Sequence, residues 1–195
     1  MTRVLGPHDA LDGPVRRIAV AGPAGSGKST LARTLGERLG VPYVEFESFF
    51  HGPGWTVRET WQADVLAHLA GDAWAIEWQG EPVRERMTAR LDVLVWLDHP
   101  RALTTTRVVL RTLKRRAGRG SKIPGGNVEG PLRTFFTDRD HIVRVSWRYH
   151  PILRARVRRT IDENRHPGLV VVRLRGQRQV DSWLRGPVSA LAGGC

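Results

Sequence analysis

Short apolar runs alternate along the chain with segments of helical periodicity. Five runs have the length and composition of buried strands, at residues 17–21, 41–46, 73–78, 92–97 and 169–174. Between the first two, Leu31, Leu35 and Leu39 recur at every fourth position, which predicts a helix from about Lys28 to Gly40. Because strands and helices alternate, the pattern predicts an α/β fold with a parallel sheet and helices on both faces.

Further helices are expected after the second and fourth runs. Thr56 and Glu59 form a capping box ahead of an apolar stripe that begins at Trp61. A long helix is predicted over about 100–117, another from about 137 to 164 with an interruption at Pro151, and a closing helix over 177–191. We expect one domain over 1–195, and the sequence leaves open whether the extension at 1–16 is ordered.

Residues 22–29 have the sequence Gly-Pro-Ala-Gly-Ser-Gly-Lys-Ser, which matches the phosphate-binding pattern Gly-x-x-x-x-Gly-Lys-Ser/Thr. A predicted strand precedes this loop and a predicted helix follows it, as the pattern requires. Glycines allow backbone amides to face a phosphate, and the helix amino terminus adds partial positive charge. We therefore predict that ATP binds through Gly22, Ala24, Gly25, Ser26, Gly27, Lys28, Ser29 and Thr30.

Lys28 would neutralise the β- and γ-phosphate oxygens, and the hydroxyl group of Ser29 would ligate Mg²⁺. The guanine-specific signature Asn/Thr-Lys-x-Asp is absent from the sequence, which disfavours a GTPase. Small phosphotransferases remain the favoured class of P-loop protein.

Three acidic residues close predicted strands. Glu45 and Glu47 end the second strand, and Glu77 ends the third. Phosphoryl transfer needs a metal ion held in place and an oriented attacking hydroxyl group. We assign Glu77, with Glu45, to the water shell of Mg²⁺, and Glu47 to accept the hydrogen of the acceptor hydroxyl. The alternative is that these acids are merely solvated. Four neighbouring residues would either line the acceptor pocket or pack in the core: Trp55, Trp78, His51 and Gln79.

Basic residues are concentrated in one part of the chain. Lysine and arginine total 31 against 19 aspartate and glutamate, a net charge of +12, and residues 101–165 contain the whole excess. Arg107, Arg111 and Lys114 share one helix face, and Arg144 and Arg148 repeat the four-residue spacing. Such faces on either side of a glycine-rich segment predict an arginine-rich lid, at 111–136, that closes on a triphosphate. A nucleic-acid surface that includes Trp147 and Tyr149, and an ordinary solvated surface, remain as alternatives. Asp98 is expected to cap the helix that starts near Pro100.

Cysteine content and apolar run lengths bear on the compartment. The single cysteine, Cys195, cannot form an internal disulfide, and no apolar run approaches the roughly 20 residues of a membrane span. We expect a cytoplasmic protein without a membrane partner.

Several segments in order give the chain a family resemblance. These are the P-loop, Glu-Phe-Glu at 45–47, Pro-Gly-Trp at 53–55, Ala-Trp-Ala-Ile-Glu at 73–77, Val-Trp-Leu-Asp-His-Pro at 95–100 and Val-Arg-Leu at 172–174. In this combination the chain resembles the adenylate kinase-like P-loop NTPases, and most closely the small P-loop kinases labelled DNA topology modulation proteins, over about 17–185.

The resemblance implies a three-layer fold with a five-stranded parallel sheet in the order 2-3-1-4-5. It also implies that Arg107, Arg111 and Arg144 contact the phosphates of the nucleotide, and that Gly176 lines the adenine through backbone contacts. The chain departs from the subgroup at 77–80, where Glu-Trp-Gln-Gly replaces the usual Asp-Gly-Asn-Tyr, and at Glu47, which replaces an aspartate.

The sequence thus favours an ATP- and Mg²⁺-dependent kinase that transfers the γ-phosphoryl group to a small-molecule hydroxyl or phosphate acceptor. Its expected catalytic residues are Lys28, Glu47, Arg107, Arg111 and Arg144. Two alternatives stay open, namely an ATP-binding regulator that contacts nucleic acid through 101–165 and a nucleotide-binding module without turnover.

Overall fold

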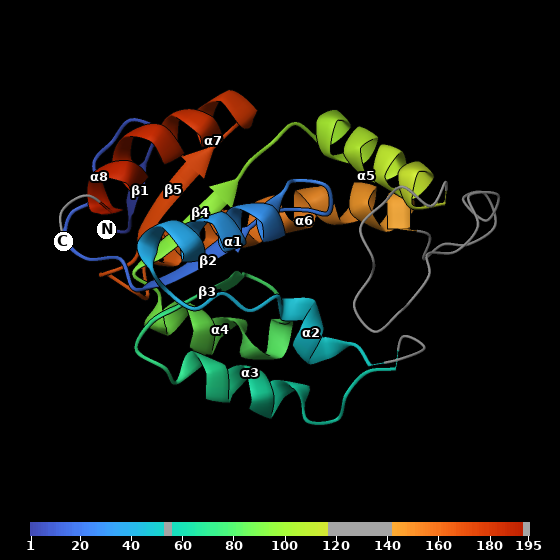
Figure 1. Ribbon diagram of the computed structural model, residues 1–195, viewed down its shortest axis with the longest axis horizontal. Coiled ribbons are helices and arrows are strands. Elements are labelled where there is room, and N and C mark those ends of the chain that lie inside the picture. The colour runs from blue at the N-terminus through green and yellow to red at the C-terminus, as the bar shows by residue number, and fades with distance from the viewer. Residues whose placement is uncertain (53–55, 117–141, 193–195) are drawn as a thin grey trace.

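Five parallel strands form a single sheet (Figure 1). The computed structural model describes residues 1–52, 56–116 and 142–192. In spatial order the strands are β1, β5, β4, β2 and β3. Their bounds are β1 Arg3–Leu5, β2 Arg17–Ala21, β3 Trp74–Glu77, β4 Val93–Leu97 and β5 Val170–Leu174.

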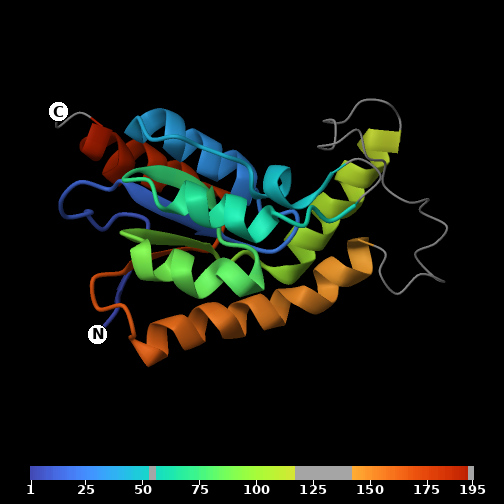
Figure 2. The same cartoon turned by 90° about the horizontal axis from the view of Figure 1, so that it is seen from below.

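Helices cover both faces of the sheet, as the alternating pattern predicts. One face packs against α1 (Lys28–Leu39), α7 (Gln177–Trp183) and the π-helical turn η4 (Leu184–Val188), which continues into α8 (Ser189–Ala192). The other face packs against α2 (Phe46–Phe50), α3 (Trp61–Leu69), α4 (Glu81–Arg90) and α6 (Ile142–Glu163). Helix α5 (Arg101–Arg116) follows β4, packs against α6 and projects beyond the strands (Figure 2).

Strand β4 shows why the central strands are continuous apolar runs. Leu94 and Trp96 point into the core beneath α4 and α6, whereas Val93, Val95 and Leu97 point into the core beneath α1 and α7. All five side chains are buried, because a parallel sheet covered on both faces leaves no solvent-facing side. The carboxyl ends of β2, β3, β4 and β5 consequently meet at one edge of a rigid layer.

The predicted strand over 41–46 is wrong. Tyr43 forms only an isolated parallel bridge with Ala75, with the backbone N–H of Ala75 donating to the carbonyl oxygen of Pro42. Pro42 has no N–H to donate, and the N–H of Phe46 donates to the side chain that ends β3 instead of to a strand. The chain therefore turns into α2 at this point.

The predicted strand order needs a correction at both edges of the sheet. The part 3-1-4-5 of the predicted order is confirmed. The third, first, fourth and fifth predicted strands correspond to β3, β2, β4 and β5, which are neighbours in that order. The second predicted strand does not form beside β3. The fifth strand of the sheet lies at the other edge, where Val4 of β1 pairs with Val171 of β5. The hydroxyl group of Thr2 also donates to the Asn164 side chain, at 3.0 Å. The extension at 1–16 thus contributes an ordered edge strand.

Helices α3 and α4 both differ from expectation. Helix α3 begins at Trp61 with Thr60 at its N-cap, so the Thr56–Glu59 pair is not its capping box. Helix α4 was not predicted, because its buried face consists only of Val83, Met87 and Thr88.

Helix α6 is continuous through Pro151, where an interruption was expected. A buried stripe runs along its length and holds both halves against the protein, despite the hydrogen bond that proline removes. The stripe consists of Val143, Ser146, His150, Leu153 and Val157. None of the helices in the described part of the chain combines the length and apolar character needed to cross a membrane.

Candidate functional site

The phosphate-binding loop connects β2 to α1, as its sequence requires. Gly25 and Gly27 have φ angles of +78° and +89°, in the left-handed region that favours glycine. A Cβ atom on Gly25 would lie only 2.3 Å from the carbonyl oxygen of Thr104 and 2.9 Å from Val108 Cγ2. The tip of the loop therefore packs directly against α5.

Helix α6 also contacts this loop. The hydroxyl group of the buried Ser146 donates to the carbonyl oxygen of Ala24, at 3.4 Å. Two helices that belong to the basic segment of the sequence thus touch the predicted phosphate site. Their positions are coupled to the conformation of the loop.

Lys28 lies among charges of both signs. Burial lowers the pKa of its ammonium group, and the nearby guanidinium group of Arg111 also lowers it. The carboxylates of Glu77, Glu47 and Glu45 act in the opposite direction and raise the pKa. The structure therefore brings the P-loop lysine, the three predicted acids and one predicted arginine into electrostatic contact. The phosphates of a bound nucleotide would further favour the charged ammonium.

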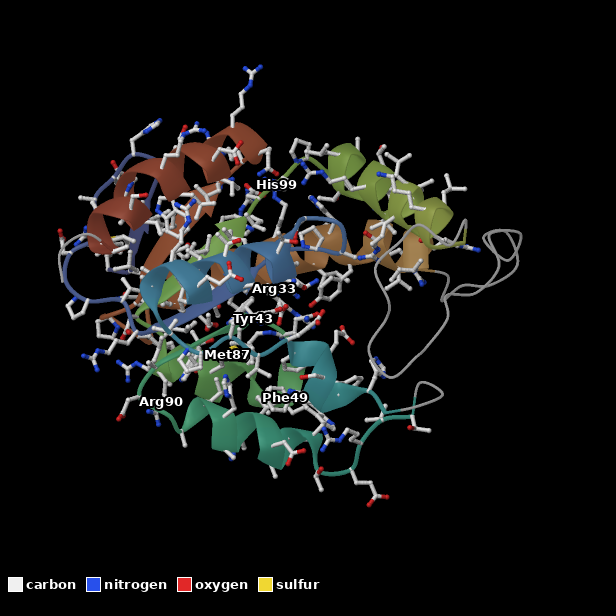
Figure 3. All side chains as sticks on the ribbon, viewed as in Figure 1. Arg33, Tyr43, Phe49, Met87, Arg90 and His99 are labelled. Carbon is white, nitrogen blue, oxygen red and sulfur yellow. The ribbon has the colours of Figure 1, made fainter. Side chains whose placement is uncertain are left out.

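Glu77 is completely buried and fixed by two hydrogen bonds. The Tyr43 hydroxyl donates to its Oε1 at 2.9 Å, and the backbone N–H of Phe46 donates to its Oε2 at 2.8 Å. Burial and the adjacent carboxylate raise the pKa of Tyr43, so this hydroxyl remains a donor. Arg33 lies over the Tyr43 ring, 5.6 Å from its centroid, and the two side chains adjoin between α1 and α2 (Figure 3).

Glu45 and Glu47 have different surroundings. Burial raises the pKa of Glu45, and Glu77 raises it further, while Arg33 acts in the opposite direction. The side chain of Glu47 is 42% exposed, and its Oε2 lies 3.4 Å from His51 Nε2. Glu47 is therefore accessible to an incoming acceptor molecule.

The donor set of this edge suits magnesium. In the described residues, no three histidine, cysteine, aspartate or glutamate side chains form a preassembled metal centre. Mg²⁺ prefers oxygen ligands, and it is usually held by one or two carboxylates together with water and substrate phosphates. The hydroxyl group of Ser29 and the carboxylates of Glu45 and Glu77 supply such oxygens. Their role as metal ligands remains a prediction.

Arg107 contacts the helix that follows β5. Its Nη2 donates to the Gln177 side chain at 3.3 Å, so it connects α5 to α7. Burial lowers the pKa of His99, and the charge of Arg107 lowers it further, which places this arginine near the end of β4. His99 itself lies between β4 and α5 (Figure 3).

Some of the other predicted residues lie in the described part of the chain, and others lie outside it. Gly176 is at the N-cap of α7 beside Gln177, and Arg144 is in the first turn of α6. The predicted lid over 111–136 lies outside the described residues beyond 116, as does Trp55. The roles of Gly176 and Arg144 in nucleotide binding remain predictions.

Trp78 belongs to the core and not to an acceptor pocket. It is 3% exposed, its Nε1 donates to Thr88 Oγ1 at 2.9 Å, and Arg84 lies over its ring. The tryptophan in the unusual segment at 77–80 therefore stabilises the packing of α4 on the sheet.

Asp98 does not cap α5 as expected. Its carboxylate is nearly buried and forms ion pairs with Arg173 on β5 and Arg154 on α6. Arg173 in turn lies over the Trp96 ring, 4.6 Å from its centroid. This cluster joins β4, β5 and α6 below the site.

Sequence reasoning missed a cavity beside the P-loop. It lies between α1 and α7, has a volume of about 200 Å³ and includes Ser26 and Gly27 in its lining. The only available signal was the spacing of Thr30 and Thr34, which places both on one face of α1. The residues that α7 contributes could not be recognised without the fold.

The part of the chain that contains these features also matches known proteins. The cytidylate kinase family model matches residues 18–78. This segment includes β2 from Ile18 onward, the P-loop, α1 and all three acidic residues, and it ends just after β3. The chain is similar to a cytidylate kinase of Maridesulfovibrio salexigens, with 42% identity over 52 residues that make up 25% of this chain and 23% of the relative.

A second relative is a bifunctional pantoate ligase/cytidylate kinase of Gloeobacter violaceus. It is 50% identical over 52 residues, which cover 27% of this chain and 10% of that protein. The chain thus spans less than a third of the length of the curated relatives it matches. The DNA topology modulation subgroup remains a prediction from the sequence.

Solved structures of kinases give longer but more distant matches. A gluconokinase from Sinorhizobium meliloti is 17% identical with a TM-score of 0.44, and the match covers 92% of this chain and 94% of that one. A putative kinase from Chloroflexus aurantiacus is 15% identical with a TM-score of 0.45, and the match covers 89% and 98%.

Proposed function

We propose that this protein is an ATP-dependent, Mg²⁺-assisted phosphotransferase that transfers the γ-phosphoryl group of ATP to a hydroxyl or phosphate group of a small molecule. One observation carries the proposal. The charges of Glu47 and Arg111 both act on the pKa of Lys28 in the P-loop, the first raising it and the second lowering it. Groups that bind a phosphate, accept a proton and neutralise a migrating phosphoryl group are therefore adjacent.

On the donor side, the backbone of the loop and the ammonium group of Lys28 would hold the β- and γ-phosphates. Arg107, Arg111 and Arg144 would neutralise charge on the transferred group, as bidentate donors do in phosphoryl transfer. Mg²⁺ at Ser29 would supply charge neutralisation between the β- and γ-phosphate oxygens.

On the acceptor side, Glu47 would accept the proton of the attacking hydroxyl group. The acceptor oxygen forms a bond to the γ-phosphorus as the bond from that phosphorus to the β–γ bridging oxygen breaks, and ADP leaves. Glu77 cannot turn easily toward an acceptor, because Tyr43 and the backbone of Phe46 hold both of its oxygens. Glu47 has no such restraint from the backbone and is more exposed.

The distribution of ion pairs favours a small anion over nucleic acid. Three of the four arginines in the second half of α6 form ion pairs: Arg154 with Asp98 just after β4, Arg156 with Glu81 of α4, and Arg159 with Glu163 of α6. The adjacent Arg165 pairs with Glu85 and Glu163. This neutralises much of the helix that a long polyanion would follow. The basic residues near the P-loop are the ones best placed to meet a phosphate.

The packing of the segment at 77–80 bears on the alternative of a module without turnover. Trp78 is buried and packs against α4, so the replaced tryptophan has a role in the core. Glu77 retains a carboxylate that acts on Lys28. The chemical groups for transfer are therefore present despite the departure from the family pattern.

The decisive experiment combines binding and turnover. We expect Lys28→Ala to abolish ATP binding in calorimetry, and Glu47→Ala to retain binding but lose transfer. Transfer is measured as ADP release over a panel of nucleosides, nucleotides, sugars and aminoglycosides. Glu37→Ala, an exposed substitution on α1, serves as the control and should behave like the wild type. Retained transfer in both site variants would refute the mechanism, and steep salt-dependent DNA or RNA binding without transfer would favour the regulator.

A further inference from the structure

His99 is a buried histidine beside the P-loop that the proposed mechanism does not use. Its side chain is only 1% exposed, and it lies where the chain passes from β4 to α5 (Figure 3). Neither nitrogen of its ring makes a well-aligned hydrogen bond to another described residue. Buried polar groups are rarely left without partners, because each unpaired group costs free energy. The ring is therefore a candidate for a second state in which its nitrogens are paired.

Two backbone groups lie close to this ring. One belongs to Ser26 in the P-loop and the other to Arg175, which follows β5, and both raise the pKa of His99. Only a hydrogen-bond acceptor favours the charged ring, so these groups act through their carbonyl oxygens. The neutral ring has a single donor, whereas the protonated ring has two. Only the protonated ring can therefore donate to both carbonyl oxygens at once.

The charges around the free protein's His99 keep its ring neutral. Burial lowers the pKa of His99, and the guanidinium group of Arg107 on α5 lowers it further. The adjacent carboxylate of Asp98 raises the pKa, but it does not outweigh the other two effects. At neutral pH the ring thus lacks the proton that would let it hold both carbonyl oxygens.

Helix α6 contributes the other titratable and charged groups that adjoin this segment. His150 Nε2 lies 2.9 Å from the carbonyl oxygen of His99, which can only accept, so this nitrogen carries a hydrogen. Arg154 forms an ion pair with Asp98, as does Arg173 from β5. These partners are already in place in the free protein. Of the charged groups around the ring, Arg107 is the one that we propose to change its partner when a nucleotide binds.

Nucleotide binding would change the charge around His99 without changing its burial. Because the ring is already 1% exposed, a ligand cannot remove it further from water. The phosphates would bring negative charge to the loop that contains Ser26. Arg107, which now donates to Gln177, would be paired with an anion. Both changes favour the protonated ring.

We propose that His99 takes up a proton from solvent when the P-loop binds the phosphates of a nucleotide, and that the protonated ring then joins the loop at Ser26 to the backbone at Arg175. His99 is thus a positioning residue, which acts on the nucleotide through the P-loop. The inference rests on the proposed function, because it assumes that the P-loop and Arg107 hold the phosphates.

The proposal makes nucleotide binding tighter in mildly acidic solution than in alkaline solution. Because the complex has the higher pKa at His99, the gain in affinity is fully present below the pKa of the free protein. It is lost as the pH rises through the pKa of the complex.

The test measures the affinity of ADP with Mg²⁺ by calorimetry on the full chain, at about pH 5.5 and about pH 8, the range in which histidine titrates. His99→Gln keeps a polar side chain that cannot be protonated, and comparison with it cancels the ionisation of ADP itself. We expect the ratio of wild-type to His99→Gln affinity to be at least about fivefold higher at the acidic pH, the low end for coupled equilibria. Calorimetry in two buffers of different ionisation enthalpy should also show greater proton uptake by the wild type. A ratio that does not change with pH would overturn the inference.

Two further variants test the cause of the effect. His8→Gln makes the same substitution at an exposed histidine before β2, and it should keep the pH dependence of the wild type. Arg107→Gln removes the positive charge next to the ring. In nuclear magnetic resonance, the ring of His99 should then titrate at a higher pH in the free protein than it does in the wild type. An unchanged titration midpoint in Arg107→Gln would contradict the coupling through Arg107.

The possible failures are distinguishable. If the wild type binds ADP at neither pH, the proposed function itself is refuted. If it binds ADP and catalyses transfer from ATP, but shares the pH dependence of His99→Gln, the function stands and the role of His99 is refuted. If circular dichroism shows that His99→Gln does not fold, the resonance titration of the wild type decides. ADP should move the midpoint of His99 to higher pH, and an unmoved midpoint would refute its role.

Discussion

The contact between the P-loop and α5 predicts a large effect for Gly25→Ala. At φ +78° a residue other than glycine costs about 1–2 kcal/mol. The added Cβ would also lie 2.3 Å from the Thr104 carbonyl oxygen, whereas real Cβ contacts are essentially never below 3.0 Å. That oxygen belongs to the helix backbone and cannot rotate away, so α5 must shift, at an overpacking cost of about 1–3 kcal/mol. We expect a total loss of about 2–5 kcal/mol in the free energy of unfolding.

Gly27→Ala is a matched control for the same loop. Gly27 also has a positive φ, +89°, but a Cβ there would meet no atom within 4 Å. Only the conformational cost of about 1–2 kcal/mol should remain. Both free energies can be measured by urea denaturation followed by tryptophan fluorescence. Equal destabilisation by the two variants would refute the reasoning, since it would mean that α5 does not restrain the loop.

The buried polar and apolar contacts give three further predictions. Asp92→Asn should destabilise the protein by about 1–3 kcal/mol at neutral pH. Burial opposes the ionisation of Asp92, but hydrogen bonds from the Arg17 side chain and from two backbone N–H groups outweigh burial and lower the pKa of Asp92. The ionised carboxylate therefore stabilises the fold above pH ~4, and this stabilisation is lost as the pH falls through the lowered pKa. Urea denaturation should accordingly show the two proteins converging in acid, and a constant gap down to the lowest pH would contradict this account. Tyr43→Phe removes the hydrogen-bond donor of a buried carboxylate oxygen of Glu77, and should lower the free energy of unfolding by about 1–3 kcal/mol in the same assay. A negligible change would mean that water hydrates this oxygen and would contradict the prediction. Leu35→Ala should cost about 2–5 kcal/mol, because Leu35 lies on the buried face of α1 and is completely buried. A loss below about 1 kcal/mol in thermal or urea unfolding would mean that this core is loosely packed.

Local signals allowed most of the site edge to be predicted from the sequence. The P-loop depends on glycines, a lysine and a serine that are contiguous, so a single strand, loop and helix determine its position. Glu45, Glu47 and Glu77 were expected to end two parallel strands, but only Glu77 ends a strand, whereas Glu45 and Glu47 lie at the start of α2. All three nevertheless act on the pKa of Lys28, and their roles remain predictions.

The errors arose where tertiary contacts replaced local patterns. The run at 41–46 has the apolar pattern of a strand, but a side-chain carboxylate on β3 takes the backbone N–H of Phe46 and the chain turns. Helix α4 has few apolar positions, and its amphipathic signal is correspondingly weak. Asp98 looked like a helix cap, since its partners Arg154 and Arg173 are 56 and 75 positions away in the chain.

The pairing of the α6 arginines also affects how ligands arrive. Acids of α4 and α6 pair with Arg156, Arg159 and Arg165, so these three arginines add little to the electric field around the protein. The chain as a whole still has a net charge of +12, which attracts a triphosphate that diffuses nearby. Such steering can accelerate association by about 10- to 1,000-fold over an uncharged encounter. The nucleotide should thus associate with the protein faster in dilute salt than in concentrated salt, even if the dissociation rate of the complex were the same in both.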